Sequence, residues 1–492
     1  MTGIDAYNIV SAGKYTGSGV RIGIYEAEGV CDTSHVNLAD KNITLHDTNS
    51  AISPHATAVT SIVALIAPNA SFFVSDTPDD LEALSWFIDN CCDVVNCSFG
   101  FYNNKLNSDG TYSKGIRSYR YDIDAIYDYQ ILAHFMTVCK SSGNVCTDNT
   151  KSDYNPDGDI TSPGFAYNVI TVGGVNRTSI DSAYRWIHAS KASYISTEPT
   201  VKPNISAPFY MFIPNIGMRN GTSFSAPLVT ACIAILEGCK PSYSAYPDRV
   251  MSVLTSTAQK TYDYGNGSFI GNFDKKVGAG IIDLDAAIES YQYTVLKNTN
   301  TAPKTEIISK ELTLTAGTEI QIALSWLATA DATNETVYVT DYDIYLYNAA
   351  GTRVITSTLS RTNVEMLRYI VPTTGTYRIV AFQFDLMNSN INQDWISLTY
   401  TVFGDDVGHV HCYEGECTPN DTSTHKRMCY CGEGFVIEEH DWTSVGTNKM
   451  RCLECMLTYV GSVPGGTIQS IKNPGVRDEI YGYIIKNDKY SN

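Results

Sequence analysis

The segment with the clearest chemical potential is 220–227, NGTSFSAP, where a Gly-Thr-Ser turn leads directly into an apolar run at 228–236. This pattern predicts a buried helix with Ser223 in its first turn. A helix N-terminus carries unpaired N–H groups and a partial positive charge, which stabilise developing negative charge. Ser223 is therefore a candidate nucleophile if a base can reach it. The alternative is an N-capping serine, which any helix can have.

A hydrolytic serine also needs a base, a carboxylate that orients the base, and a donor for the oxyanion. His55 begins a predicted helix and is the candidate base. Glu26 ends a predicted strand and is the candidate carboxylate, and Asn144 follows another strand and is the candidate oxyanion donor. Each candidate stands at a strand end or a helix start.

Strand-like and helix-like segments alternate through residues 1–295. This alternation predicts an α/β domain with a mostly parallel sheet and helices on both faces. Active sites in such sheets lie at the carboxyl ends of the strands. The strands are expected at 20–25, 72–74, 93–97, 135–138 and 169–172, and the helices at 55–67, 79–90 and 121–132.

The pattern changes near residue 297. Residues 298–304 have the composition of a linker, and 305–403 contains only short strands separated by turns, which predicts an antiparallel β-sandwich or jelly roll. We therefore expect an α/β domain at 1–297, a β-sandwich at 298–404, and a small Cys-rich module with a tail at 405–492.

Composition narrows the function classes. Hydrophobic residues make up 43% of the 492 residues and charged residues 17%, which is typical of a globular protein. The net charge of −18 argues against binding to a nucleic-acid backbone. No apolar run reaches the length expected of a membrane span, and the first residues lack the features of a signal peptide. The chain is then either cytosolic or a trimmed mature form.

Eight of the 14 cysteines lie in the first half and six lie between Cys412 and Cys455. Cys232, inside the apolar helix, is expected to be a buried free thiol. Cys139 and Cys146 flank one loop and could form a bridge. Cysteine use alone does not decide the redox compartment.

These motifs resemble those of the subtilisin-like serine peptidases over residues 4–290. The string GTSFSAPLVTA at 221–231 matches the family's serine signature at every defined position. The string VNCSFG at 95–100 resembles its substrate-binding strand, and SGN at 142–144 its oxyanion loop. The histidine motif matches except at Ala56, where the family has Gly. The order of carboxylate, His, Asn and Ser is also the family's.

The main departure is the carboxylate, because the family ends its first strand with Asp where this chain has Glu26. Glutamate keeps the negative charge that orients the imidazole and stabilises the imidazolium. It is one methylene longer, so we expect the strand end to lie slightly further back. Asp32 is the alternative, but it stands where the family often has a second, non-catalytic Asp.

A second departure concerns metal. Many family members carry a calcium-binding insertion in or after the histidine helix, whereas segment 64–68 runs straight on to the next strand here. We therefore expect no metal ion at the site and no cofactor for catalysis.

The resemblance implies a role for each residue. Ser223 would attack the scissile carbonyl, His55 would move its proton, and Glu26 would orient His55, while Asn144 and the Ser223 N–H would stabilise the oxyanion. The substrate would lie extended beside Ser98, Phe99 and Gly100. The substrate residue before the cleaved bond would lie against Ser141, Ser142 and Gly143.

Acidic residues follow the second segment. They could favour basic residues at the cleavage site, although a solvated acidic loop is the simpler interpretation. They are Asp148, Asp153, Asp157 and Asp159.

The remaining parts suggest accessory roles. Residues 305–403 resemble the β-sandwich that follows the catalytic domain in some secreted members of the family, on the strings LSW at 324–326, DYDIYL at 341–346 and GTYRI at 375–379. Histidines and cysteines then recur at spacings that suit either disulfides, which we favour, or a structural zinc. They are His425, Cys429, Cys431, His440, Cys452 and Cys455.

The sequence thus predicts a secreted or surface serine endopeptidase that hydrolyses proteins or peptides. Its precursor is expected to carry a propeptide, as is usual in the family. One alternative is a catalytically impaired pseudopeptidase that binds partners. The other is an adhesin-like surface protein in which the β-sandwich and the Cys-rich module bind targets.

Overall fold

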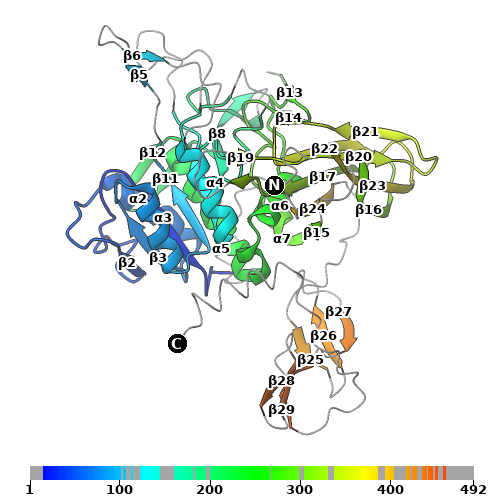
Figure 1. Ribbon diagram of the computed structural model, residues 1–492. Coiled ribbons are helices and arrows are strands. Elements are labelled where there is room, and N and C mark those ends of the chain that lie inside the picture. The colour runs from blue at the N-terminus through cyan, green and yellow to red at the C-terminus, as the bar shows by residue number, and fades with distance from the viewer. Residues whose placement is uncertain are drawn as a thin grey trace. The chain divides into compact units, whose positions relative to one another are not determined.

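The structure is a computed structural model (Figure 1). It describes residues 15–100, 104–106, 112–114, 122–144, 160–180, 183–195, 200–266, 269–297, 304–330, 337–385 and 394–403, and short stretches at 417–420, 424–428, 435–439, 442–446, 449–452 and 458–460. The chain divides into two compact units. The first holds residues 1–287 and 292–405, and the second holds 288–291 and 406–492.

The centre of the first unit is a sheet with strand order β10-β8-β7-β4-β1-β3-β2. All neighbours along this order pair in parallel, which confirms the predicted parallel α/β sheet. A further strand, β9 (Ala183–His188), pairs antiparallel with β8. The parallel strands are β1 (Arg21–Tyr25), β2 (Asn42–Leu45), β3 (Ser71–Ser75), β4 (Val94–Cys97), β7 (Thr137–Ser141), β8 (Ile170–Ile180) and β10 (Ile205–Pro208).

Helix α5 (Thr222–Cys239) is the core helix of this unit and contacts β4, β7, β8, β10 and α2. It carries apolar and small residues all round, so nearly every side chain along it is buried. In length and composition α5 could cross a membrane, contrary to the sequence expectation that no run is long enough, but 83% of it is buried inside the protein. The other helices are α2 (Pro54–Ile66), α3 (Asp80–Asp89), α4 (Asp122–His134), α6 (Pro247–Thr257), α7 (Leu284–Glu289) and the 3-10 helix η1 (Pro241–Ala245).

The largest differences from the expected element boundaries are at β7 and β8. The strand expected at 135–138 is β7 at Thr137–Ser141, because Phe135 is still hydrogen-bonded to Ile131 at the end of α4. The strand expected at 169–172 continues to Ile180, where its second half pairs only with β9. Sequence analysis also missed α6 and the hairpin of β11 (Tyr210–Ile213) and β12 (Gly217–Asn220).

The antiparallel strands expected after residue 305 form, together with the earlier strand β15, two four-stranded sheets, β15-β24-β17-β22 and β16-β23-β20-β21. The sheets share one hydrophobic core, in which the rings of Trp326 and Tyr342 meet edge to face at 5.0 Å. The strands are β15 (Tyr291–Lys297), β16 (Thr305–Leu314), β17 (Glu319–Trp326), β20 (Asp341–Tyr347), β21 (Arg353–Ser357), β22 (Val364–Ile370), β23 (Gly375–Asp385) and β24 (Asp394–Phe403).

Helix α6 joins these sheets to the parallel-sheet domain, because it packs against β17 and β24. The contact contains buried polar groups as well as apolar side chains. The Oγ of Ser252 lies 2.7 Å from Oγ1 of Thr399, and Ser397 donates to Asp248 at 2.5 Å. These partners are 147 and 149 residues apart in sequence.

Further two-stranded pairs lie in the described part of the first unit. They are β5 (Asn104–Leu106) with β6 (Tyr112–Lys114), β13 (Phe269–Ile270) with β14 (Phe273–Asp274), and β18 (Thr329–Ala330) with β19 (Val337–Tyr338). Cys232 is a buried free thiol, as expected. Cys139 is also a buried free thiol, so the suggested bridge to Cys146 is wrong.

The described residues of the second unit form two three-stranded antiparallel sheets. They are built from β25 (Cys417–Pro419), β26 (Thr424–Met428), β27 (Phe435–Glu439), β28 (Trp442–Gly446), β29 (Lys449–Cys452) and β30 (Thr458–Val460). Cys412, Cys429, Cys431, His440 and Cys455 lie outside the described residues. The choice between disulfides and zinc therefore stays a prediction. Among the described residues, no group of three or more His, Cys, Asp or Glu could hold a metal ion.

Candidate active site

The carboxyl ends of three adjacent strands place the candidate residues at one edge of the sheet. Strand β4 lies between β1 and β7, with Tyr25 beside Cys97 and Cys97 beside Lys140. Glu26 directly follows β1, Ser98 directly follows β4, and Ser142 directly follows β7. Because parallel strands end on the same edge, these segments emerge together.

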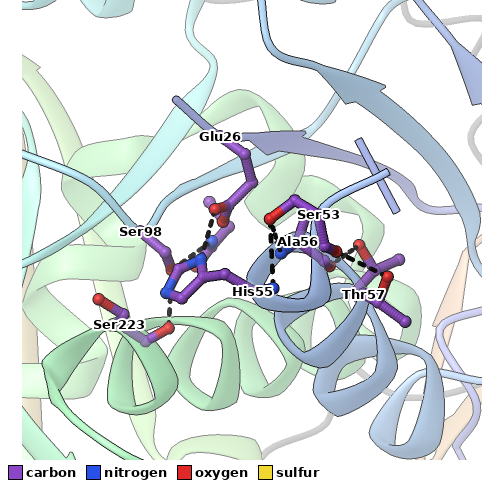
Figure 2. Close-up of polar contacts among 9 residues, drawn as sticks. Glu26, Ser53, His55, Ala56, Thr57, Ser98 and Ser223 are labelled. Atoms are coloured by element: carbon purple, nitrogen blue, oxygen red, sulfur yellow. Dashed lines mark hydrogen bonds and ion pairs between the residues drawn. The ribbon is translucent and has the colours of Figure 1, made fainter. Parts of the chain in front are cut away.

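His55 is held in the first turn of α2. Ser53 is the N-cap, and its hydroxyl accepts hydrogen bonds from the N–H groups of His55 at 3.2 Å and Ala56 at 3.3 Å (Figure 2). Pro54 occupies the first helical position, where a missing N–H costs nothing. Thr57 also stabilises this first turn, because its Oγ1 donates a hydrogen bond to the Ser53 carbonyl at 2.8 Å. The imidazole is thus anchored to a capped helix start.

Glu26 and His55 are in direct contact. The Nδ1 of His55 lies 2.7 Å from Oε2 of Glu26, whose side chain is only 3% exposed (Figure 2). Burial raises the pKa of Glu26, although the hydrogen bond and charge of His55 oppose that rise. Burial alone would lower the pKa of His55, but the hydrogen bond to Glu26 and its charge raise it above the ordinary value. Glu26 therefore favours the imidazolium form of His55.

Asp32, the alternative carboxylate, has a different role. Its Oδ1 accepts hydrogen bonds from the N–H of Ser34 at 2.9 Å and from the Ser34 hydroxyl at 2.6 Å. These hydrogen bonds lower the pKa of Asp32. The carboxylate that contacts the imidazole is therefore that of Glu26.

Ser223 lies in the first turn of α5 and is not its cap. The cap position is taken by Gly221, with a φ of +131° and no side-chain hydrogen bond. Figure 2 shows the imidazole of His55 between Glu26 and Ser223. The next residue, Phe224, packs its ring 5.3 Å from the ring of His55. The N-capping alternative for Ser223 is therefore excluded.

A chain of hydrogen bonds connects β4 to the start of α5. Thr230 donates to the side-chain oxygen of Asn96 at 3.2 Å, and the Asn96 amide donates to Ser98 at 2.8 Å. The Ser98 hydroxyl in turn donates to the carbonyl of Ser223 at 2.8 Å. Asn96, Ser98 and Thr230 are all buried, so this chain sets the position of the helix start relative to the sheet.

Asn144 is fixed by the residue before the serine. Its side-chain oxygen accepts hydrogen bonds from the N–H of Thr222 at 2.8 Å and from the Thr222 hydroxyl at 3.1 Å. The N–H of Gly143 donates back to the Thr222 hydroxyl at 3.1 Å. Because the amide oxygen faces Thr222, the NH₂ group of Asn144 must face the other way.

The residues expected to bind substrate lie at and just after the carboxyl ends of β4 and β7. Ser98 is buried, and Phe99 and Gly100 are half-buried. The Phe99 ring packs edge to face against Tyr25 at 4.7 Å. Ser141, Ser142 and Gly143 are buried, and the Ser142 N–H donates to the Val172 carbonyl at 2.8 Å. Asp148, Asp153, Asp157 and Asp159 lie outside the described residues.

Sequence reasoning missed several residues that build the site. Ser53 could have been found from its place before Pro54, a helix-start signal. Thr222 is part of the quoted serine motif, but nothing in the motif indicates that it orients Asn144. Lys140 and Thr161 carry no sequence signal, because their contact depends on how β7 and the segment before β8 are arranged in space.

In chemical terms, the arrangement holds a serine at a helix N-terminus beside an imidazole, with a buried carboxylate on the other ring nitrogen. A carboxamide is fixed next to the serine. This is the set of groups that acyl transfer through a serine requires.

Comparison of the sequence with a family model points to the same chemistry. The sequence model of the Subtilase family matches residues 2–280. Solved structures similar to this chain include the prenylagaramide maturation protease PagA, at 17% identity and a TM-score of 0.42 over 58% of this chain and 98% of that one. A lanthipeptide protease has 16% identity and a TM-score of 0.42 over 58% and 91%. Fervidolysin from Fervidobacterium pennivorans, a keratinolytic enzyme related to subtilisin, has 15% identity and a TM-score of 0.44 over 93% and 69%.

Proposed function

Because the chain belongs to the Subtilase family and is a serine-type peptidase, we propose that it is an endopeptidase whose triad is Ser223, His55 and Glu26. The observation that carries this proposal is the 2.7 Å contact between His55 Nδ1 and the buried Glu26 carboxylate. A carboxylate at Nδ1 keeps the proton on that nitrogen and leaves Nε2 as the base. Glutamate can therefore take the place of the family's usual aspartate.

In the proposed reaction, Nε2 of His55 accepts the hydroxyl proton while Ser223 attacks the scissile carbonyl. The same proton then passes to the leaving amine, which departs. Water then attacks the acyl-enzyme with His55 again as the base, and this releases the acyl group from Ser223. Glu26 stays ionised and stabilises the imidazolium, consistent with the raised pKa of His55.

The oxyanion would be stabilised by the NH₂ group of Asn144 and the backbone N–H of Ser223. The contact of Asn144 with Thr222 supports this role, because it directs the NH₂ group away from Thr222. Each such donor contributes roughly 3 kcal/mol to the transition state. The substrate would lie extended along Ser98, Phe99 and Gly100. The side chain of the residue before the cleaved bond would lie against Ser141, Ser142 and Gly143.

The remaining assignments are also proposals. We place the enzyme outside the cell or on its surface, with a propeptide in its precursor and proteins or peptides as substrates. The two antiparallel sheets with their shared core would form a jelly-roll β-sandwich that supports the catalytic domain. No cofactor is needed for this mechanism. The Cys-rich module would be held by disulfides, with a structural zinc as the alternative.

The proposal is tested by fluorophosphonate labelling and casein hydrolysis of the wild type, Ser223→Ala and Glu26→Ala. Loss of both signals in Ser223→Ala, with strong reduction in Glu26→Ala, would support a Ser-His-Glu peptidase. A folded wild type that neither labels nor cleaves would contradict it and favour a binding protein without catalysis.

A further inference from the structure

The backbone carbonyl of Ser223 cannot form the hydrogen bond that an α-helix normally provides. In α5 this carbonyl would accept from the backbone N–H four residues later, but that residue is Pro227, which has no N–H. A proline ring also crowds the carbonyl four residues before it. The Ser223 carbonyl therefore needs a donor from outside the helix, because a buried backbone acceptor without a partner costs free energy.

Ser98 supplies this donor from the end of β4. Its hydroxyl donates to the Ser223 carbonyl at 2.8 Å, although the two residues are 125 positions apart. The amide of Asn96 donates to the Ser98 oxygen at 2.8 Å, so the single hydroxyl proton of Ser98 is left for Ser223. Both residues are buried, with exposed fractions of 3% for Ser98 and 0% for Asn96. The direction of the hydrogen bond is therefore fixed by its surroundings.

Ser98 also belongs to the segment along which the substrate is proposed to lie. The next residue, Phe99, packs its ring edge to face on Tyr25 at 4.7 Å, and Tyr25 directly precedes Glu26. This segment thus contacts the helix of the nucleophile on one side and the strand of the carboxylate on the other. A substrate that paired with its backbone would have the bond to be cleaved placed relative to Ser223. This step rests on the substrate position given under the proposed function.

We propose that Ser98 is a positioning residue for the peptidase reaction: its hydroxyl replaces the hydrogen bond that Pro227 removes and fixes Ser223 relative to the substrate-binding segment. Fixing this carbonyl fixes the main chain of Ser223, which carries the attacking hydroxyl and the N–H proposed for the oxyanion. Ser98 acts through Ser223 and exchanges no proton with the substrate. Small displacements of a reacting group are costly, since about 1 Å can lower a rate 10²-fold.

The simpler interpretation is that the Ser98 hydroxyl only satisfies a buried acceptor. In that case its removal would lower stability but leave the rate of the folded enzyme unchanged. The two interpretations therefore differ in kcat, measured per folded active site.

The first measurement compares the full-length wild type with Ser98→Ala on an N-acylated tetrapeptide p-nitroanilide. Active sites are counted by fluorophosphonate titration, so that unfolded protein does not enter kcat. We expect kcat to fall about 10–100-fold with KM within about threefold of the wild type, because the substrate pairs with the backbone of Ser98 and not with its side chain. An unchanged kcat would overturn the proposal.

A double-mutant cycle with Pro227→Ala tests the reason for the effect. Alanine at 227 restores a backbone N–H that can donate to the Ser223 carbonyl within the helix. In the Pro227→Ala background, Ser98→Ala should therefore lower kcat by no more than about threefold. An equal fold-loss in both backgrounds would show that Ser98 does not replace the helical hydrogen bond.

Ser206→Ala is the matched control. Ser206 is also buried, and its hydroxyl donates to a distant backbone carbonyl, that of Val277, at 3.2 Å. It lies on β10 and does not contact Ser223 through this hydroxyl, so kcat should stay near the wild-type value in both backgrounds.

Folding and labelling decide the remaining outcomes. If Ser98→Ala does not fold, recovery of folding and cleavage in the double variant with Pro227→Ala supports the proposal. A double variant that stays unfolded while Pro227→Ala alone folds contradicts it. A wild type that labels and cleaves, with equal losses in the two backgrounds, overturns the role of Ser98 and leaves the peptidase assignment intact. A folded wild type that neither labels nor cleaves overturns both.

Discussion

The side-chain oxygen of Asn144 accepts a hydrogen bond from the backbone N–H of Thr222 at 2.8 Å. Only an acceptor can face an N–H group, so this contact assigns the orientation of the carboxamide. It also joins the segment after β7 to the residue before Ser223, across 78 residues of sequence. This hydrogen bond therefore fixes the position of the proposed oxyanion donor, Asn144, relative to the proposed nucleophile, Ser223.

Asn144→Asp is the sharpest test of this relationship. The substitution keeps the oxygen that accepts from Thr222 but replaces the NH₂ donor with an anionic oxygen. We expect kcat to fall by roughly 10²–10³-fold or more, with a small change in KM. Steady-state kinetics would check this, with circular dichroism to show that the fold is kept. A kcat within a few-fold of the wild type would contradict the oxyanion role.

Gly221 should not tolerate a side chain. Its φ of +131° is strained for any L-residue, and an added Cβ would lie 3.3 Å from the Asn144 amide nitrogen. We expect Gly221→Ala to lower the free energy of unfolding by about 1–3 kcal/mol and to reduce kcat by displacing Asn144. Gly351→Ala is the matched control, since it also has positive φ, +74°, but nothing within 4 Å of its Cβ. Gly351→Ala should lower the free energy of unfolding but leave kcat unchanged.

The pH dependence of activity should depend on Glu26. The base form of His55 is neutral, so kcat/KM should rise with pH through a pKa above the ordinary histidine value. Glu26→Gln removes the hydrogen bond and charge that raise this pKa, while the burial that lowers it remains. The acid limb should therefore move to lower pH, and the plateau should fall by up to about 10⁴-fold.

The control for this prediction is Asp32→Asn. Asp32 bonds to Ser34 and not to the imidazole, so the acid limb of the pH profile should stay near that of the wild type. An acid limb that moves in Asp32→Asn but not in Glu26→Gln would contradict the assignment of Glu26.

Arg368 should be important for stability but not for catalysis. Its Nη2 donates to the carbonyls of Ala258 at 2.9 Å and Ala279 at 2.6 Å, which joins β22 to the parallel-sheet domain. Arg368→Met would leave buried carbonyls unsatisfied, at a cost of about 1–3 kcal/mol in the free energy of unfolding. Denaturant unfolding would measure this, with fluorophosphonate labelling as the check on the site.

Arg378→Met is the matched control for Arg368. Arg378 forms an ion pair with Glu306 at 2.9 Å, and both side chains are partly exposed. Such pairs contribute about 0–1 kcal/mol. Equal destabilisation by the two substitutions would argue against a structural role for the buried contact.

Sequence reasoning located most of the site because its signals are local. The serine motif, the start of the histidine helix and the strand ends each depend on residues within a few positions. The parallel sheet followed from the alternation of strands and helices. Helix α6 was missed because polar residues interrupt its pattern, and its burial comes from β17 and β24.

The sequence by itself determined the class of this protein: an α/β fold, a serine in the first turn of a buried helix, and candidates for each partner that the serine requires. Only the tertiary structure decided that Glu26 and not Asp32 meets His55, that Thr222 orients Asn144, and that the Lys140 ammonium reaches Thr161. The physical reason is distance along the chain. Local patterns depend on neighbouring residues, whereas these contacts join residues 21 to 78 positions apart and exist only once the strands are in register.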